Sequence, residues 1–189
     1  MLSTISLESS VRRILVEKRQ GFDLEAKALK KDLIESLHID TIENVRILNR
    51  YDIEGIDGEV YENAAKTIFS EPNLDIVYHE TLEFNEGERV FAIEYLPGQY
   101  DQRADSASEC LALLSAEDKV EIKSAKIVIL KGKISKNDLD KIKKYYINPV
   151  DSREVDIESK ELASISNMPK DVQVLNGFTK KTIAELEEF

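Results

Sequence analysis

The chain has 189 residues, of which 42% are hydrophobic, and 26 Lys and Arg against 37 Asp and Glu give it a net charge of −11 at pH 7. A chain of this length buries roughly 70% of its extended surface on folding, which is enough for a core without disulfides. The acidic charge argues against a nucleic-acid partner, because phosphate backbones are bound through Lys and Arg.

The first ten residues lack the basic and apolar segments of a secretion signal, so we expect residues 1–10 to form a short disordered leader. No membrane-spanning segment is expected, because the longest aliphatic stretch covers only residues 127–130 and a membrane helix needs about 20 apolar residues. Cys110 is the only cysteine, which is typical of a reducing compartment. We therefore expect a cytoplasmic protein, with a periplasmic protein that lacks disulfides as the alternative.

The first half of the chain, residues 11–82, follows a strand, helix, strand, helix, strand pattern. Gly21 ends the first strand, and Asp23 is placed to cap the next helix by accepting bonds from its free backbone amides. Apolar residues spaced by three or four put one face of that helix against a core. This apolar stripe consists of Phe22, Ala26, Leu29, Leu33 and Leu37. The other predicted elements are strands at 11–18, 44–53 and 74–82 and a helix at 59–70.

The second half, residues 88–157, repeats the pattern. Ser135 and Asp138 resemble a capping box at the start of its second helix, whose inner face would carry Leu139, Ile142 and Tyr146. The first helix has an apolar stripe formed by Ala104, Ala107, Leu111 and Leu114. The predicted elements are strands at 89–96, 124–131 and 153–157, a helix at 101–115 and a helix that opens at Ser135.

Residues at matching places in the two halves also agree. The pairs Phe22 and Tyr100, Ala26 and Ala104, and Val77 and Val155 are 78 apart, whereas Gly21 and Gly98, and Pro72 and Pro149, are 77 apart. We expect an α+β fold in which two pseudo-repeated halves form a fused pseudo-dimer, joined face to face or edge to edge, with helices on the outside of the sheets. The alternative is that the halves share only common turn residues. We expect residues 158–189 to form the start of a linker.

No pattern of catalytic or metal-binding residues stands out. The glycines form no phosphate loop, and neither His38 nor His79 has a second His or Cys at ligand spacing. The clearest candidate is the polar turn LPGQYDQRA at the start of the 101–115 helix, which is either an ordinary capped turn or a contact surface for a partner or phosphate. Its candidate contact residues are Pro97, Gly98, Gln99, Tyr100, Asp101, Gln102 and Arg103.

Several stretches of the chain resemble the N-terminal part of phosphoribosylformylglycinamidine synthase, the large single-chain enzyme of purine biosynthesis. They are RILVEKRQGFDLEAKALKKDL, NVRILNRYDIEG, KTIFSEPNLD, RVFAIEYLPGQYDQRADSA and YYINPVDSRE, in this order over most of residues 12–157. In that family the N-terminal domain resembles a dimer of the small subunit of multi-chain versions, which agrees with the repeat.

The resemblance implies a parent enzyme that uses ATP, Mg²⁺ and glutamine to convert formylglycinamide ribonucleotide to its amidine. The chain would then be a non-catalytic scaffold with no cofactor of its own. Its partners would be the synthetase and glutaminase domains of the same parent chain, and it would help to enclose the ammonia path. The main alternative is a regulatory module of paired α+β domains that binds a small effector between its halves, and a third is an independent small enzyme.

Overall fold

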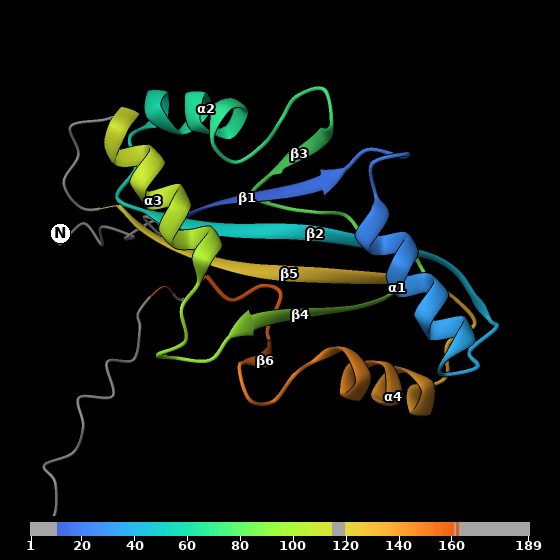
Figure 1. Cartoon of the computed structure of the whole chain (residues 1–189). Helices are drawn as coiled ribbons and strands as arrows, with labels where there is room; N and C mark the ends of the chain where they lie inside the picture. The colour runs from blue at the N-terminus through green and yellow to red at the C-terminus, as the bar shows by residue number, and fades with distance from the viewer. Residues whose placement is uncertain (1–10, 115–119, 161, 163–189) are drawn as a thin grey trace, which may run out of the picture.

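The computed structural model describes residues 11–114, 120–160 and 162 (Figure 1). The predicted leader and nearly all of the predicted linker lie outside these residues. The strands are β1 (Val11–Lys18), β2 (Ile42–Glu54), β3 (Asp75–His79), β4 (Arg89–Tyr95), β5 (Glu121–Gly132) and β6 (Ser152–Val155). The helices are α1 (Leu24–Glu35), α2 (Gly58–Thr67), α3 (Gln102–Leu114) and α4 (Lys136–Tyr146). The predicted order of elements is therefore confirmed for these residues.

The strands form one six-stranded antiparallel sheet with the order β3-β1-β2-β5-β4-β6. The α+β class is confirmed. Of the two expected ways of joining the halves, face to face and edge to edge, the structure has the second, so there is one sheet with its helices on one face instead of helices outside two sheets. The two halves join edge to edge through the long β2 and β5 pair, which hides the strand edge that each half would otherwise leave open. All four helices pack against the same face of this sheet (Figure 1).

Strand pairing repeats from one half to the other. Val16 pairs with Asn49 and Val77, and 77 residues later (93 − 16) Ile93 pairs with Lys126 and Glu154. In the sheet, Val77 therefore corresponds to Glu154. The sequence matches it to Val155, one residue further along. Asn49 and Lys126 also pair with each other at the centre of the sheet.

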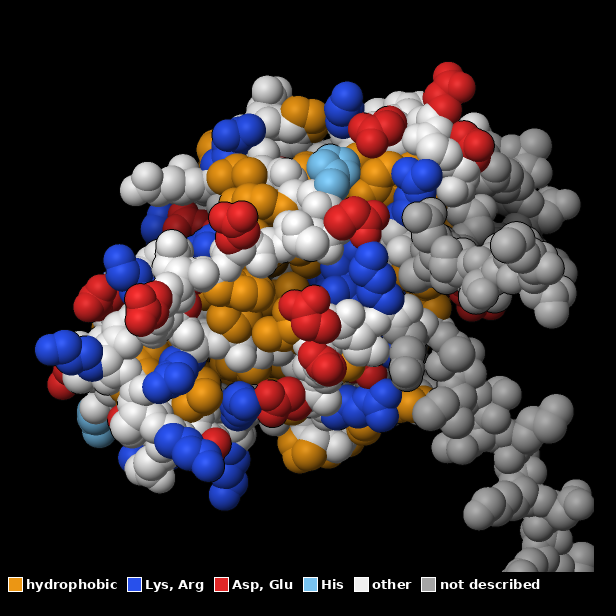
Figure 2. Space-filling model, turned by 180° about the vertical axis from the view of Figure 1, so that it is seen from behind, with side chains coloured by type: hydrophobic (Ala, Val, Ile, Leu, Met, Phe, Trp, Pro, Cys, Tyr) orange, Lys and Arg blue, Asp and Glu red, His pale blue; other side chains and the backbone are white. Residues whose placement is uncertain are grey.

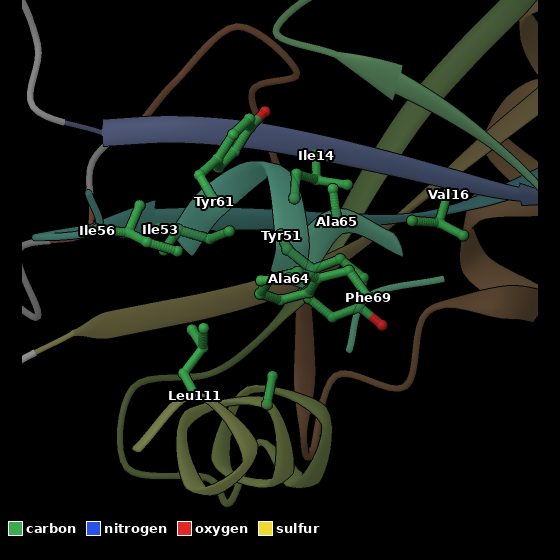
Figure 3. Close-up of a cluster of buried hydrophobic side chains, with 11 residues drawn as sticks. Ile14, Val16, Tyr51, Ile53, Ile56, Tyr61, Ala64, Ala65, Phe69 and Leu111 are labelled. Carbon is green, nitrogen blue, oxygen red and sulfur yellow. The ribbon is translucent and has the colours of Figure 1, made fainter. Parts of the chain in front are cut away.

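Each of the two cores on the helix face draws on both halves of the chain. In the first, α2 packs on β1 and β2, and α3 of the second half adds Ala107 and Leu111 (Figure 3). In the second, α4 packs with β4 and β5, and α1 of the first half adds Ala26, Leu29 and Leu33. The strand residues that face the helices alternate along the strands, as a half-buried sheet requires.

Two helix ends differ from the sequence predictions. Asp23 makes no capping bond at α1; its carboxylate accepts a bond from the Gly21 amide and pairs with Lys27 at 2.6 Å. Phe22 precedes the helix and is 52% exposed, and Leu114 at the end of α3 is 48% exposed, so neither belongs to the core. The predicted cap at Ser135 is confirmed, because its hydroxyl accepts a bond from the Asp138 amide and donates one to the Asp138 carboxylate. Among the helices of the described residues, none has the length and apolar character to cross a bilayer.

The opposite face of the sheet carries no helix in the described part of the chain. Figure 2, seen from behind, shows apolar side chains near its middle with charged side chains around them. Leu48, Ile127 and Ile129 are buried there. Two ion pairs on this face occupy positions 77 apart (94 − 17 and 123 − 46), because the 2.6 Å pair of Glu17 and Arg46 is matched by the 2.7 Å pair of Glu94 and Lys123.

The Glu94 carboxylate should make stability depend on pH. Burial opposes its ionisation, but hydrogen bonds from Lys123 and Arg153 outweigh burial and lower the pKa of Glu94. A carboxylate with a lowered folded-state pKa stabilises the protein above its unfolded-state pKa, and this contribution is lost as pH falls through the folded-state pKa. Glu94→Gln should therefore cost about 1 to 2 kcal/mol at pH 7.

The difference between wild type and Glu94→Gln should shrink below about pH 4, where the unfolded carboxylate is protonated. Urea unfolding from pH 3 to pH 7 measures this difference. The exposed Glu109→Gln serves as the control and should show no comparable pH dependence. A Glu94→Gln penalty that stayed constant over this pH range would contradict the assignment.

Candidate functional site

The turn that the sequence singles out connects β4 to α3. Its backbone reverses at Gly98, whose φ of 89° lies in the left-handed region, and Gln99 donates its amide proton to the Leu96 carbonyl at 3.0 Å. The side chains of Pro97, Gln99 and Tyr100 are exposed, and Tyr100 is 67% exposed. Gln102 is also exposed, so most of the predicted contact residues are accessible.

Asp101 differs from the rest of this turn because its carboxylate accepts hydrogen bonds from both α3 and β5. One carboxylate oxygen accepts bonds from the Ala104 amide at 3.0 Å and the Ser124 hydroxyl at 2.8 Å. The other accepts a bond from the Ser124 amide at 2.9 Å. Asp101 thus caps α3 and ties its start to β5. The sequence indicated the cap but not the tie to a residue 23 positions away.

Replacing Asp101 with alanine should lower the free energy of unfolding by about 2 kcal/mol, because it removes a helix cap and charge-assisted bonds to Ser124. Urea unfolding measures the change. Gln102→Ala, at the neighbouring exposed position, should change stability by less than about 0.5 kcal/mol. Equal effects of the two substitutions would show that Asp101 has no structural role.

The turn lies beside the loop that leads into β6. Leu96 donates its amide proton to the Asp151 carbonyl at 2.8 Å, and the Gln99 side chain approaches the Val150 carbonyl at 3.5 Å. Tyr100 donates its phenol proton to the Asp105 carboxylate at 2.6 Å, and this bond raises the pKa of Tyr100. The exposed side chains of Tyr95 and Val150 belong to the same surface, which sequence spacing alone could not assemble.

Arg103 points away from this surface into a cleft of about 1100 Å³ on the helix face. One of its guanidinium nitrogens lies 3.4 Å from the Tyr51 hydroxyl oxygen. The cleft is bounded by residues from β1, β2, β3, the start of α1 and the end of α2. The sequence did not predict this cleft. Its one sequence signal is Asn49, a polar residue in the otherwise apolar alternation of Val45, Ile47, Tyr51 and Ile53 along β2.

Three residues considered for chemistry are placed without a catalytic arrangement. Cys110 is exposed on α3. His79 lies with its Nδ1 3.0 Å from the Tyr61 hydroxyl, and His38 occupies a left-handed position after α1 with φ 55°. Among the described residues, no group of three or more His, Cys, Asp or Glu side chains could hold a metal ion.

No protein-family model matches this chain, and no curated protein is significantly similar to it.

Proposed function

We propose that the chain is the N-terminal scaffold domain of a phosphoribosylformylglycinamidine synthase. In this role it docks the synthetase and glutaminase domains of its parent chain and helps to enclose the ammonia path between them. The parent uses ATP and Mg²⁺, whereas this domain contributes binding surface and no catalytic residue. The proposal rests first on the sequence resemblance, whose most specific stretches are LPGQYDQRA and INPVDSR.

The repeated strand register is the structural observation that carries the proposal. A pseudo-dimer made by duplication should keep the same pairing in both halves, and the pairing repeats at an interval of 77 residues. The strand order also reads as β3-β1-β2 followed by its mirror order β5-β4-β6. The repeated Glu17 and Glu94 ion pairs add a side-chain correspondence. Together these support a fused dimer of one small α+β unit.

The surface of the β4 to α3 turn is the best-supported docking surface, because the two halves differ at its Tyr95 and Val150 positions. Tyr95 is 44% exposed and Val150 is 75% exposed. The residues 77 positions earlier are Lys18 and Asn73. One half therefore carries polar side chains where the other exposes apolar ones, and exposed apolar patches commonly mark protein contacts. We name the surface of Tyr95, Pro97, Gln99, Tyr100 and Val150 the apolar turn surface.

The test is made in the full-length parent enzyme. The triple variant Tyr95→Lys, Tyr100→Ser and Val150→Asn replaces three exposed apolar or aromatic side chains of the apolar turn surface with polar ones and leaves Asp101 intact. Glutamine-dependent turnover should fall at least about tenfold, since removing a few interface anchors typically costs more than 1 kcal/mol each. Ammonia-dependent turnover should fall less, because free ammonia does not need the enclosed path.

The matched control replaces exposed residues away from this surface, Leu24→Lys and Tyr145→Ser. Both rates should stay near wild type in this variant. If the triple variant also leaves both rates and domain association unchanged, the apolar turn surface is not the docking surface. If the full-length protein shows no formylglycinamide ribonucleotide amidation at all, the proposed function itself is wrong.

A further inference from the structure

We propose that the cleft beside Arg103 binds a small molecule that carries a carboxylate or phosphate group. Arg103 and the Tyr51 hydroxyl would hold the anionic group, and Asn49 would accept a hydrogen bond from the rest of the ligand. The cleft volume of about 1100 Å³ suits a small molecule. This binding role goes beyond the docking role proposed above and does not depend on it.

The two halves differ at the centre of the helix face. Glu25 near the start of α1 and Arg103 near the start of α3 occupy matching positions, 78 apart (103 − 25), and Asn49 and Lys126 match at 77 apart (126 − 49). Glu25 forms an ion pair with Lys126 and accepts a bond from the Tyr146 hydroxyl at 3.2 Å. On that side of the pseudo-dimer the two matching residues are therefore engaged with each other.

On the matching side, Arg103 has no such partner. Three other cations that line the cleft are engaged within the protein: Lys18 with Asp75 at 2.8 Å, Lys27 with Asp23 at 2.6 Å, and Lys30 with the Glu43 carbonyl. The Arg46 side chain belongs to the opposite face of the sheet and pairs there with Glu17 at 2.6 Å. Within the described residues, the one bond found for Arg103 is to the neutral Tyr51 hydroxyl. Arg103 is exposed, so its charge is accessible to an anion from outside the chain, and guanidinium groups match carboxylate and phosphate geometry.

The groups around Arg103 add to this site. Tyr51 is only 6% exposed and packs its ring against Phe69, with ring centroids 4.9 Å apart, so its hydroxyl is held in place. The Asn49 side-chain oxygen is buried and has no hydrogen-bond partner within the described structure. A buried acceptor of this kind is costly unless it is paired. A ligand with both an anionic group and an N–H or O–H donor would satisfy Arg103 and Asn49 together.

Isothermal titration calorimetry of the 189-residue protein tests the inference with three probes: inorganic phosphate, AMP and L-glutamate. At least one probe should bind one to one at about millimolar concentration or below. Binding of phosphate and AMP identifies a phosphate site, whereas binding of glutamate alone identifies a carboxylate site. Arg103→Ala should weaken binding at least about tenfold, since a charge-assisted bond is lost.

Two further variants keep the test independent of folding. Asn49→Asp adds a negative charge to the cleft and should weaken anion binding while the unfolding transition stays cooperative. Lys144→Ala removes an equal charge from the exposed face of α4 and should leave the affinity unchanged. The inference is overturned if none of the three probes binds, or if Arg103→Ala and Lys144→Ala bind the probe as well as wild type.

Discussion

Replacing Asp52 with asparagine should lower the free energy of unfolding by about 3 to 5 kcal/mol, because it breaks a buried ion network and leaves its cations uncompensated. The Asp52 carboxylate accepts a bond from the Arg13 guanidinium at 2.5 Å. Its second oxygen lies 3.1 Å from Nε of the Arg50 guanidinium. All three side chains are at most 5% exposed. Burial lowers the pKa of Arg50, which shows how costly its charge is at this place.

Backbone carbonyls complete this network, which we name the buried triad of Arg13, Arg50 and Asp52. Arg13 donates to the carbonyls of Ile157 at 2.7 Å and of Ser159, and Arg50 donates to the Asp156 carbonyl at 3.2 Å. The triad therefore fastens the segment that follows β6 across β1 and β2. Loss of Asp52 should loosen this segment as well as destabilise the sheet.

The second half of the chain provides the control for this prediction. The residues 77 positions after the triad are Val90, Ile127 and Ile129. The triple variant Arg13→Val, Arg50→Ile and Asp52→Ile removes all the charges together, so it should be markedly more stable than Asp52→Asn. Guanidinium chloride unfolding of both variants measures the difference. If Asp52→Asn costs under about 1 kcal/mol, the triad is not a buried, coupled network.

Replacing Gly132 with alanine should cost at least about 3 kcal/mol, the sum of backbone strain and a steric clash. Gly132 ends β5 with φ 140°, which L residues rarely adopt. A Cβ atom there would lie 2.2 Å from the Thr41 carbonyl oxygen and 3.1 Å from the Glu43 amide nitrogen. These contacts are with backbone at the irregular start of the β2 and β5 pairing, so they cannot be relieved by turning a side chain.

Gly98 offers a matched control, because it also has a positive φ but no atom within 4 Å of the position of a Cβ. Gly98→Ala should therefore cost only about 1 kcal/mol, the strain of the left-handed conformation. Thermal and urea unfolding of the two variants separate strain from clash. Similar losses for Gly98→Ala and Gly132→Ala would show that close approach to β2 plays no part.

Hydrophobic periodicity predicted which elements form and which faces they bury, because alternation and helical spacing are local properties. Strand β1 has the predicted bounds, and Ala104, Ala107 and Leu111 are buried as expected. Periodicity says nothing about which edges pair, so the joining of β2 to β5 into one sheet could not be derived from it. Phe22 was misplaced because its helical spacing continues beyond the true start of α1.

The candidate site was predicted only in part, for the same reason. The sequence singled out residues 97–103 as polar and turn-like, but it could not separate exposed Tyr100 from Asp101, which is bonded to β5. That separation depends on Ser124, which is distant in sequence. The cleft around Arg103 likewise requires Tyr51 and Asn49 from β2 of the other half.

The sharing of helices between the two cores has a consequence for biosynthesis. As the chain emerges from the ribosome, β1, β2 and α2 are complete before α3 has been synthesised. The core cluster that contains Tyr61 and Ala64 therefore lacks Leu111 at this stage. The edge of β2 that pairs with β5 likewise stays unpaired until β5 has been synthesised. A nascent first half therefore exposes apolar surface and an unpaired strand edge, both of which invite aggregation. Early translation is the stage at which this protein should depend most on chaperones.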